Sequence, residues 1–178
     1  MSSDEWQACT DPQAMLLHLR GRAGDRELRL FACACCRRIW DYMPDASRKA
    51  VEVAERFANG EAPEADLARA EAGAWDAVNS LMDMLVVTPK EERRPIRVHV
   101  EASKAAAETA VCRMGRWPTD APSVLEAGNA KAWSAAWVVS NIVTGAVRRA
   151  RPDGDRSEIE AEERKRHADL LRKIVGQQ

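Results

Sequence analysis

Apolar side chains recur at helical spacing along almost the whole of this 178-residue chain, and that periodicity constrains the fold more than any other feature. Residues 63–87 show it most clearly, because their apolar positions follow one another mainly at steps of three and four. These positions are Leu67, Ala70, Ala74, Val78, Leu81, Met82 and Leu85. A strand needs alternation at a step of two, and the nearest candidate, residues 96–100, is very short. The sequence therefore predicts an all-α chain.

Capping residues, glycines and prolines divide the chain into helices of ordinary length. Asp11-Pro12 is typical of a helix start, and Asp25 is the expected N-cap of a helix that runs to about residue 43. Pro44 and Gly60 are expected to stop the helices before them. We expect a helical turn at residues 3–6 and helices over residues 11–21, 25–43, 45–59, 63–87, 97–114, 123–149 and 157–175.

The connections between these helices are short, so most neighbours are expected to be antiparallel. The predicted fold is a compact single-domain bundle of about seven to eight mostly antiparallel helices over residues 1–178. A charged run interrupted by a proline makes residues 88–96 the candidate for a loop or an internal boundary. The seventh helix contains an uncharged stretch of 16 residues, 132–147, which is shorter than the roughly 20 residues of a spanning helix. We therefore expect it to be a buried core helix, and we expect no membrane partner.

Charge and cysteine content exclude several classes of protein. The net charge of −1 gives no global excess that would attract nucleic acid or a cationic partner. The opening residues MSSDEWQ lack the basic and apolar segments of a signal peptide, so a cytoplasmic location is expected. The five cysteines are then expected to be reduced.

Three of those cysteines, Cys33, Cys35 and Cys36, crowd into one apolar helical segment. Cys33 and Cys36 have C-x-x-C spacing, so they could bind a soft metal or act as a redox pair, with Cys112 or a histidine as a further ligand. A structural zinc site needs a second ligand pair, and the motif does not recur. A mid-helix apolar position also raises a thiol pKa, so we favour core packing and expect no cofactor.

The histidines offer a second metal hypothesis. His18, His99 and His167 could converge from three helices, although no spacing demands it. A di-iron bundle would place Glu three residues before its histidines, and those positions hold Met15, Ile96 and Arg164. We therefore favour ordinary surface or core histidines.

Two short arginine clusters are candidate phosphate contacts. They comprise Arg93, Arg94 and Arg97, and Arg148, Arg149 and Arg151. Acidic residues lie near both clusters, and cations at the end of a helix interact favourably with its dipole. We favour a solvated helix end, keep Arg148 and Arg149 as candidate partner contacts, and keep an arginine-based nucleic-acid binder as an alternative function.

Six tryptophans are many for this length. Trp6 near the terminus and Trp117 in an expected loop are the best candidates for exposed partner contacts, although core packing remains the favoured interpretation. The chain contains no phosphate-binding glycine loop, nucleophile elbow or H-E-x-x-H zinc motif. No nucleophile with a base can be identified, so an enzyme is not the leading hypothesis.

The chain also resembles a family of short α-helical proteins common in planctomycete-type bacteria. The resemblance covers about the first third of the chain and its last ten residues. It rests on W-x4-D-P-x2-M-L at 6–16, R-L-F-A-C-A-C-C-R-R-I-W at 29–40, A-V-E-x-A-E-R-F-A-x-G at 50–60 and L-L-R-x-I-x-G at 170–176. It implies an interaction or regulatory module of a bacterial cytoplasm and brings no activity, cofactor or site residue.

The leading hypothesis is thus a helical protein-interaction or regulatory and adaptor module, which binds another protein or a second copy of itself. The first alternative is a metal- or thiol-dependent site on the Cys33, Cys35 and Cys36 cluster. The second alternative is the arginine-based nucleic-acid binder.

Overall fold

Helices account for nearly all of the regular structure in this chain. The structure is a computed structural model that describes residues 1–110, 130–151 and 153–176. Within these residues the elements are α1 (Ser3–Ala8), α2 (Pro12–Leu19), α3 (Asp25–Arg37), the 3₁₀ turn η1 (Trp40–Tyr42), α4 (Asp45–Ala58), α5 (Glu64–Val87), the 3₁₀ turn η2 (Lys90–Glu92), α6 (Arg93–Thr109), α7 (Ala130–Ala150) and α8 (Arg156–Val175). The described residues contain no strand, and the predicted all-α bundle is confirmed.

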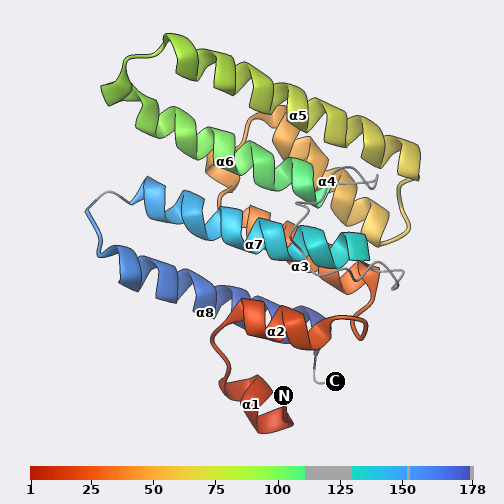
Figure 1. The fold of residues 1–178 in the computed structure, drawn as a ribbon. Coiled ribbons are helices and arrows are strands. Elements are labelled where there is room, and N and C mark those ends of the chain that lie inside the picture. Colours follow the sequence, from red (N-terminus) through yellow and green to blue (C-terminus); the bar gives the residue numbers. More distant parts are fainter. Residues whose placement is uncertain (111–129, 152, 177–178) are drawn as a thin grey trace.

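Helix α7 lies near the middle of the bundle and packs against α6, α3 and α8 (Figure 1). Helix α5 packs against α6 and α4, and α2 lies against α8. Successive long helices run in opposite directions, so α6 begins at the same end of the bundle where α7 ends and α8 begins (Figure 1). That end, at the left of Figure 1, carries the candidate site.

The inward faces of α3, α6 and α7 supply the largest share of the core, and buried residues of α2, α4, α5 and α8 complete it. Helix α3 contributes large apolar side chains, whereas α6 and α7 face each other with small ones that let their backbones approach. The fully buried residues of these three faces include Leu28, Phe31, Cys35, Ala102, Ala105, Ala106, Ala136, Val139 and Val143. The uncharged segment of α7 is therefore a core element, as expected. None of the described helices combines the length and the apolarity that crossing a bilayer requires.

The third helix differs from its prediction at both ends. Its N-cap is Gly24 rather than Asp25, which is the first helical residue. It ends at Arg37, well before Pro44, and the chain tightens into η1. This tightening places Ile39 in the core. The predicted helix to residue 43 was too long because a 3₁₀ turn keeps almost the same apolar spacing.

The sixth helix begins earlier than predicted, at Arg93 rather than Arg97. Pro95 lies in its first turn, where the missing N–H would have no helical acceptor, so the proline does not delay the start. The predicted end of this helix, the loop after it and residues 123–129 lie outside the described residues. The remaining long helices start and end within one or two residues of their predicted limits.

Candidate functional site

A pocket of about 370 Å³ is lined by residues from the start of α6, the end of α7 and the start of α8. We call it the cationic pocket. All eight of its lining residues within the described chain are basic, and none is acidic or aromatic. They are Lys90, Arg93, Arg94, Arg97, Arg148, Arg149, Arg151 and Arg156. The two arginine clusters that are remote in the sequence therefore form one site.

Hydrogen bonds from two arginines to the backbone hold this pocket in shape. The Arg94 side chain donates from Nε to the carbonyl oxygen of Arg149 at 3.0 Å, and so joins the start of α6 to the end of α7. The Arg93 Nε donates to the carbonyl oxygen of Thr88 at 2.8 Å, which fixes the turn before α6. The last carbonyls of a helix lack partners within it and carry partial negative charge, so α7 favours a cation there.

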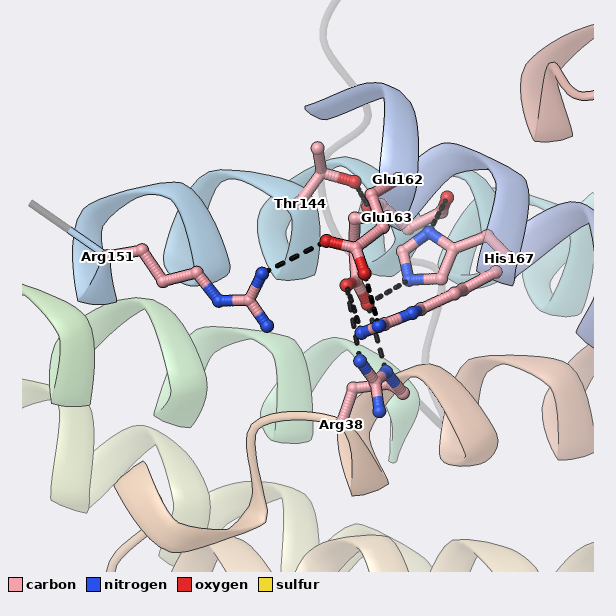
Figure 2. Close-up of polar contacts among 8 residues, drawn as sticks. Arg38, Thr144, Arg151, Glu162, Glu163 and His167 are labelled. Carbon is pink, nitrogen blue, oxygen red and sulfur yellow. Dashed lines mark hydrogen bonds and ion pairs between the residues drawn. The ribbon is translucent and has the colours of Figure 1, made fainter. Parts of the chain in front are cut away.

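Three of the eight cations are neutralised by carboxylates that lie outside the lining. Each of these arginines is partly exposed, so its ion pair contributes modestly to stability. The pairs are Arg148 Nη1 with Glu160 Oε1 at 2.6 Å, Arg149 Nη1 with Glu101 Oε2 at 3.2 Å, and Arg151 Nη1 with Glu162 Oε2 at 3.1 Å (Figure 2 shows the last).

The other five cations, Lys90, Arg93, Arg94, Arg97 and Arg156, have no carboxylate partner among the described residues. The side chains of Arg93 and Arg94 bind backbone carbonyls, whereas those of Lys90, Arg97 and Arg156 make no hydrogen bond within the described part of the chain. Converging unpaired cations repel one another and create a positive potential that attracts anions. The lining of the pocket therefore carries an excess of positive charge.

Exposed apolar side chains adjoin this pocket at the end of α5. Met82, Met84, Val86 and Val87, which we call the apolar tip, are 43%, 51%, 76% and 83% exposed. The apolar stripe predicted along α5 includes Leu81, Met82 and Leu85. In the structure, no residue of this stripe after Val78 is buried. Arg93 connects the two features, since its Nη2 lies 3.5 Å from the carbonyl oxygen of Val86. Four exposed apolar residues within the last six positions of α5 are a candidate contact surface.

A second hollow, of about 390 Å³, runs along α7 and shares Arg148 and Arg149 with the cationic pocket. It differs in charge, because the carboxylates of Glu101 and Glu160 line it together with its arginines. Three arginines and two glutamates line this hollow, so its charge is largely balanced, whereas the lining of the cationic pocket contains no carboxylate.

A buried ionic cluster lies inside the bundle and was not predicted (Figure 2). Glu163 of α8 is 1% exposed and receives Nε and Nη2 of Arg38 at 3.1 and 3.4 Å. His167 Nε2 approaches its Oε1 at 3.4 Å, and His167 Nδ1 lies 3.0 Å from Ser140 Oγ. Burial acts to raise the pKa of Glu163, but the contacts from His167 and Arg38 outweigh it and lower the pKa to about 2.

The order Ser140, His167, Glu163 has the residue types of a hydrolytic triad, but its placement excludes that chemistry here. Ser140 borders the second hollow, but all three residues are at most 1% exposed, so the Ser140 hydroxyl offers almost no surface to a substrate. The cluster joins α3, α7 and α8, and its role is structural.

The cysteine cluster lies in the core. Cys33, Cys35 and Cys36 are at most 1% exposed, and burial raises the pKa of each thiol, for Cys36 to about 12. Cys36 Sγ lies 3.2 Å from Thr109 Oγ1. No group of three or more His, Cys, Asp or Glu residues able to hold a metal occurs among the described residues. The thiol and metal alternative gains no support from this geometry, and Cys112 lies outside the described chain.

The remaining candidates are dispersed. Trp6 is 6% exposed and its ring lies beside that of His18, so it is not an exposed contact, and the favoured interpretation of core packing fits its burial. Trp117 lies outside the described residues.

His99 Nδ1 donates to the carbonyl oxygen of Tyr42 at 2.6 Å, and the three histidines have separate partners. Of the predicted contacts, Arg148 and Arg149 belong to the cationic pocket.

Comparison of the chain with protein-family models, with curated proteins and with solved structures finds no match. The function is therefore inferred from the residues of this chain and their geometry.

Proposed function

We propose that this chain is a helical protein-interaction module, of regulatory or adaptor type, that binds an acidic segment of a partner protein in the cytoplasm. The observation that supports this is the cationic pocket, in which eight basic side chains converge and five lack a carboxylate partner among the described residues. Electrostatic complementarity of this kind steers a partner and fixes its register.

The apolar tip indicates what else the partner presents. Val86 and Val87 are more exposed than any other large apolar residue that the structure describes. A segment that carries acidic side chains beside apolar ones would place the former in the pocket and bury the latter on the tip. Methionine at two of the four tip positions suits such a surface, because its flexible side chain adapts to different partners.

Nucleic acid is a weaker fit to the same pocket. Proteins that bind single strands combine a basic groove with aromatic side chains on which bases stack, and no aromatic residue lines this pocket within the described chain. A duplex contacts many phosphates over an extended surface, whereas these cations converge on one hollow. We therefore propose a protein partner.

A labelled peptide that alternates glutamate with leucine tests the proposal by fluorescence anisotropy. We expect binding that weakens as salt is raised, since charge pairs at a surface are screened. Arg97→Glu with Arg156→Glu should weaken binding about tenfold or more, because two attractions become repulsions. Val86→Ser with Val87→Ser should weaken it by a smaller factor.

The matched control is Arg69→Glu, which reverses a charge on an arginine of α5 whose side chain is 79% exposed and which does not line the pocket. It should leave the affinity within about twofold of the wild type. Peptide binding that the pocket variants and the control weaken equally, or no binding at all, would contradict the proposal.

A further inference from the structure

We infer that the anion matched by the cationic pocket is a pair of adjacent phosphate groups on a doubly phosphorylated partner segment. This inference rests on the proposed function and specifies the chemistry of its ligand. It depends on three properties of the pocket, which are its charge density, the identity of its donors and its lack of aromatic lining among the described residues.

Charge density favours phosphate over carboxylate. Five cations without a carboxylate partner surround one hollow of about 370 Å³, which is near the lower end of the range for small-ligand sites, about 300–1,000 Å³. A carboxylate brings a single charge on its own side chain, so balancing the pocket would require several side chains in a space that admits few. A phosphate monoester carries about −1.5 to −2 near neutral pH, so two of them supply similar charge in far less volume.

The donors also match phosphate. Seven of the eight lining residues are arginines, whose planar fork binds two phosphate oxygens at once. The guanidinium N–H groups of Arg97 and Arg156 bind no other described residue, and the Arg94 guanidinium uses only Nε, on the carbonyl oxygen of Arg149. These three arginines and Lys90 are therefore the groups that would contact the phosphates directly.

Ion pairs hold the other three arginines of the lining. Glu101, Glu160 and Glu162 hold Arg149, Arg148 and Arg151, so these three arginines are already partly neutralised. Because carboxylates hold these three arginines, the unpaired cations of the lining are the groups that can reorient around a ligand. Substitution of an unpaired arginine should accordingly reduce binding more than substitution of a paired one.

Isothermal titration calorimetry on the full chain tests the inference with defined probes. These are inorganic pyrophosphate, orthophosphate, a peptide with two adjacent phosphoserines, and the same peptide with two glutamates in their place. We expect the doubly phosphorylated peptide to bind about tenfold or more tightly than the glutamate peptide, and pyrophosphate more tightly than orthophosphate. Arg97→Gln and Arg156→Gln should each weaken phosphopeptide binding about fivefold or more, whereas Arg69→Gln should not change it.

Each alternative outcome has a distinct meaning. If the glutamate peptide binds as tightly as the phosphorylated one, the inference is overturned and the proposed function stands. If neither peptide binds, both fail. Tighter binding of a single-stranded oligonucleotide or of anionic phospholipid vesicles than of the phosphopeptide would also overturn the inference. The wild-type comparison between probes decides the matter even if a variant fails to fold.

Discussion

The buried ionic cluster and the cationic pocket use the same residue type in opposite ways. In the cluster, the guanidinium of Arg38 meets Glu163, which also contacts His167, so each charge inside the bundle has a partner. In the pocket, Arg97 and Arg156 have no partner among the described residues, although acidic residues are abundant in the chain. Paired charges hold helices together, whereas unpaired ones at a surface are a cost that a binding partner can offset.

Breaking the cluster should produce the largest effect. Glu163→Gln removes the negative charge that Arg38 and Arg166 share, which leaves the partly buried Arg38 without its carboxylate, whereas Arg166 keeps Glu162. We expect the free energy of unfolding to fall by about 3 kcal/mol, at the lower end of values for broken buried pairs. Urea unfolding monitored by circular dichroism measures this.

The control for that experiment is Glu162→Gln, one residue earlier on α8. Its side chain is 47% exposed and pairs with Arg151 and Arg166 at the surface. We expect a loss of less than about 1 kcal/mol. If the two substitutions cost the same, the buried cluster does not have the structural role assigned to it.

Lowering the pH should gradually remove the contribution that the Glu163 carboxylate makes to stability. The pKa of Glu163 is lowered from 4.5 to about 2 in the folded chain, so its contribution to stability is fully present above pH 4.5 and is lost as pH falls toward 2. The difference in unfolding free energy between the wild type and Glu163→Gln should therefore shrink across that window. A difference that stays constant from pH 5 to pH 2 would contradict the assigned pKa.

The sequence predicted the helices far better than either polar site. Periodicity located α4, α5 and α8 closely, because each buries one face. The i to i+4 spacing of Glu163 and His167 was visible, but Arg38 lies 125 residues away from Glu163 and only packing brings it close. Burial of such a carboxylate cannot be read from local spacing.

The pocket could have been found by combining two predictions already made. One arginine cluster lies at the start of a helix and the other at the end of its expected antiparallel neighbour, and such ends lie together. The sequence could not show which acidic residue pairs with which arginine. Glu101 pairs with Arg149, whereas Asp155, which is close to the arginines in the sequence, caps the start of α8. Only the folded structure distinguishes paired arginines from unpaired ones.

The most direct test of this account is urea unfolding of the wild type and of Arg97→Gln with Arg156→Gln, each with and without pyrophosphate. Without ligand, the variant should be more stable by up to about 1 kcal/mol, because repulsion between surface cations is relieved. With pyrophosphate at about a hundredfold above its Kd, the wild type should gain about 2.7 kcal/mol and become the more stable protein. A variant that is less stable under both conditions, or a wild type that pyrophosphate does not stabilise, would contradict the claim that these cations are kept unpaired for an anion.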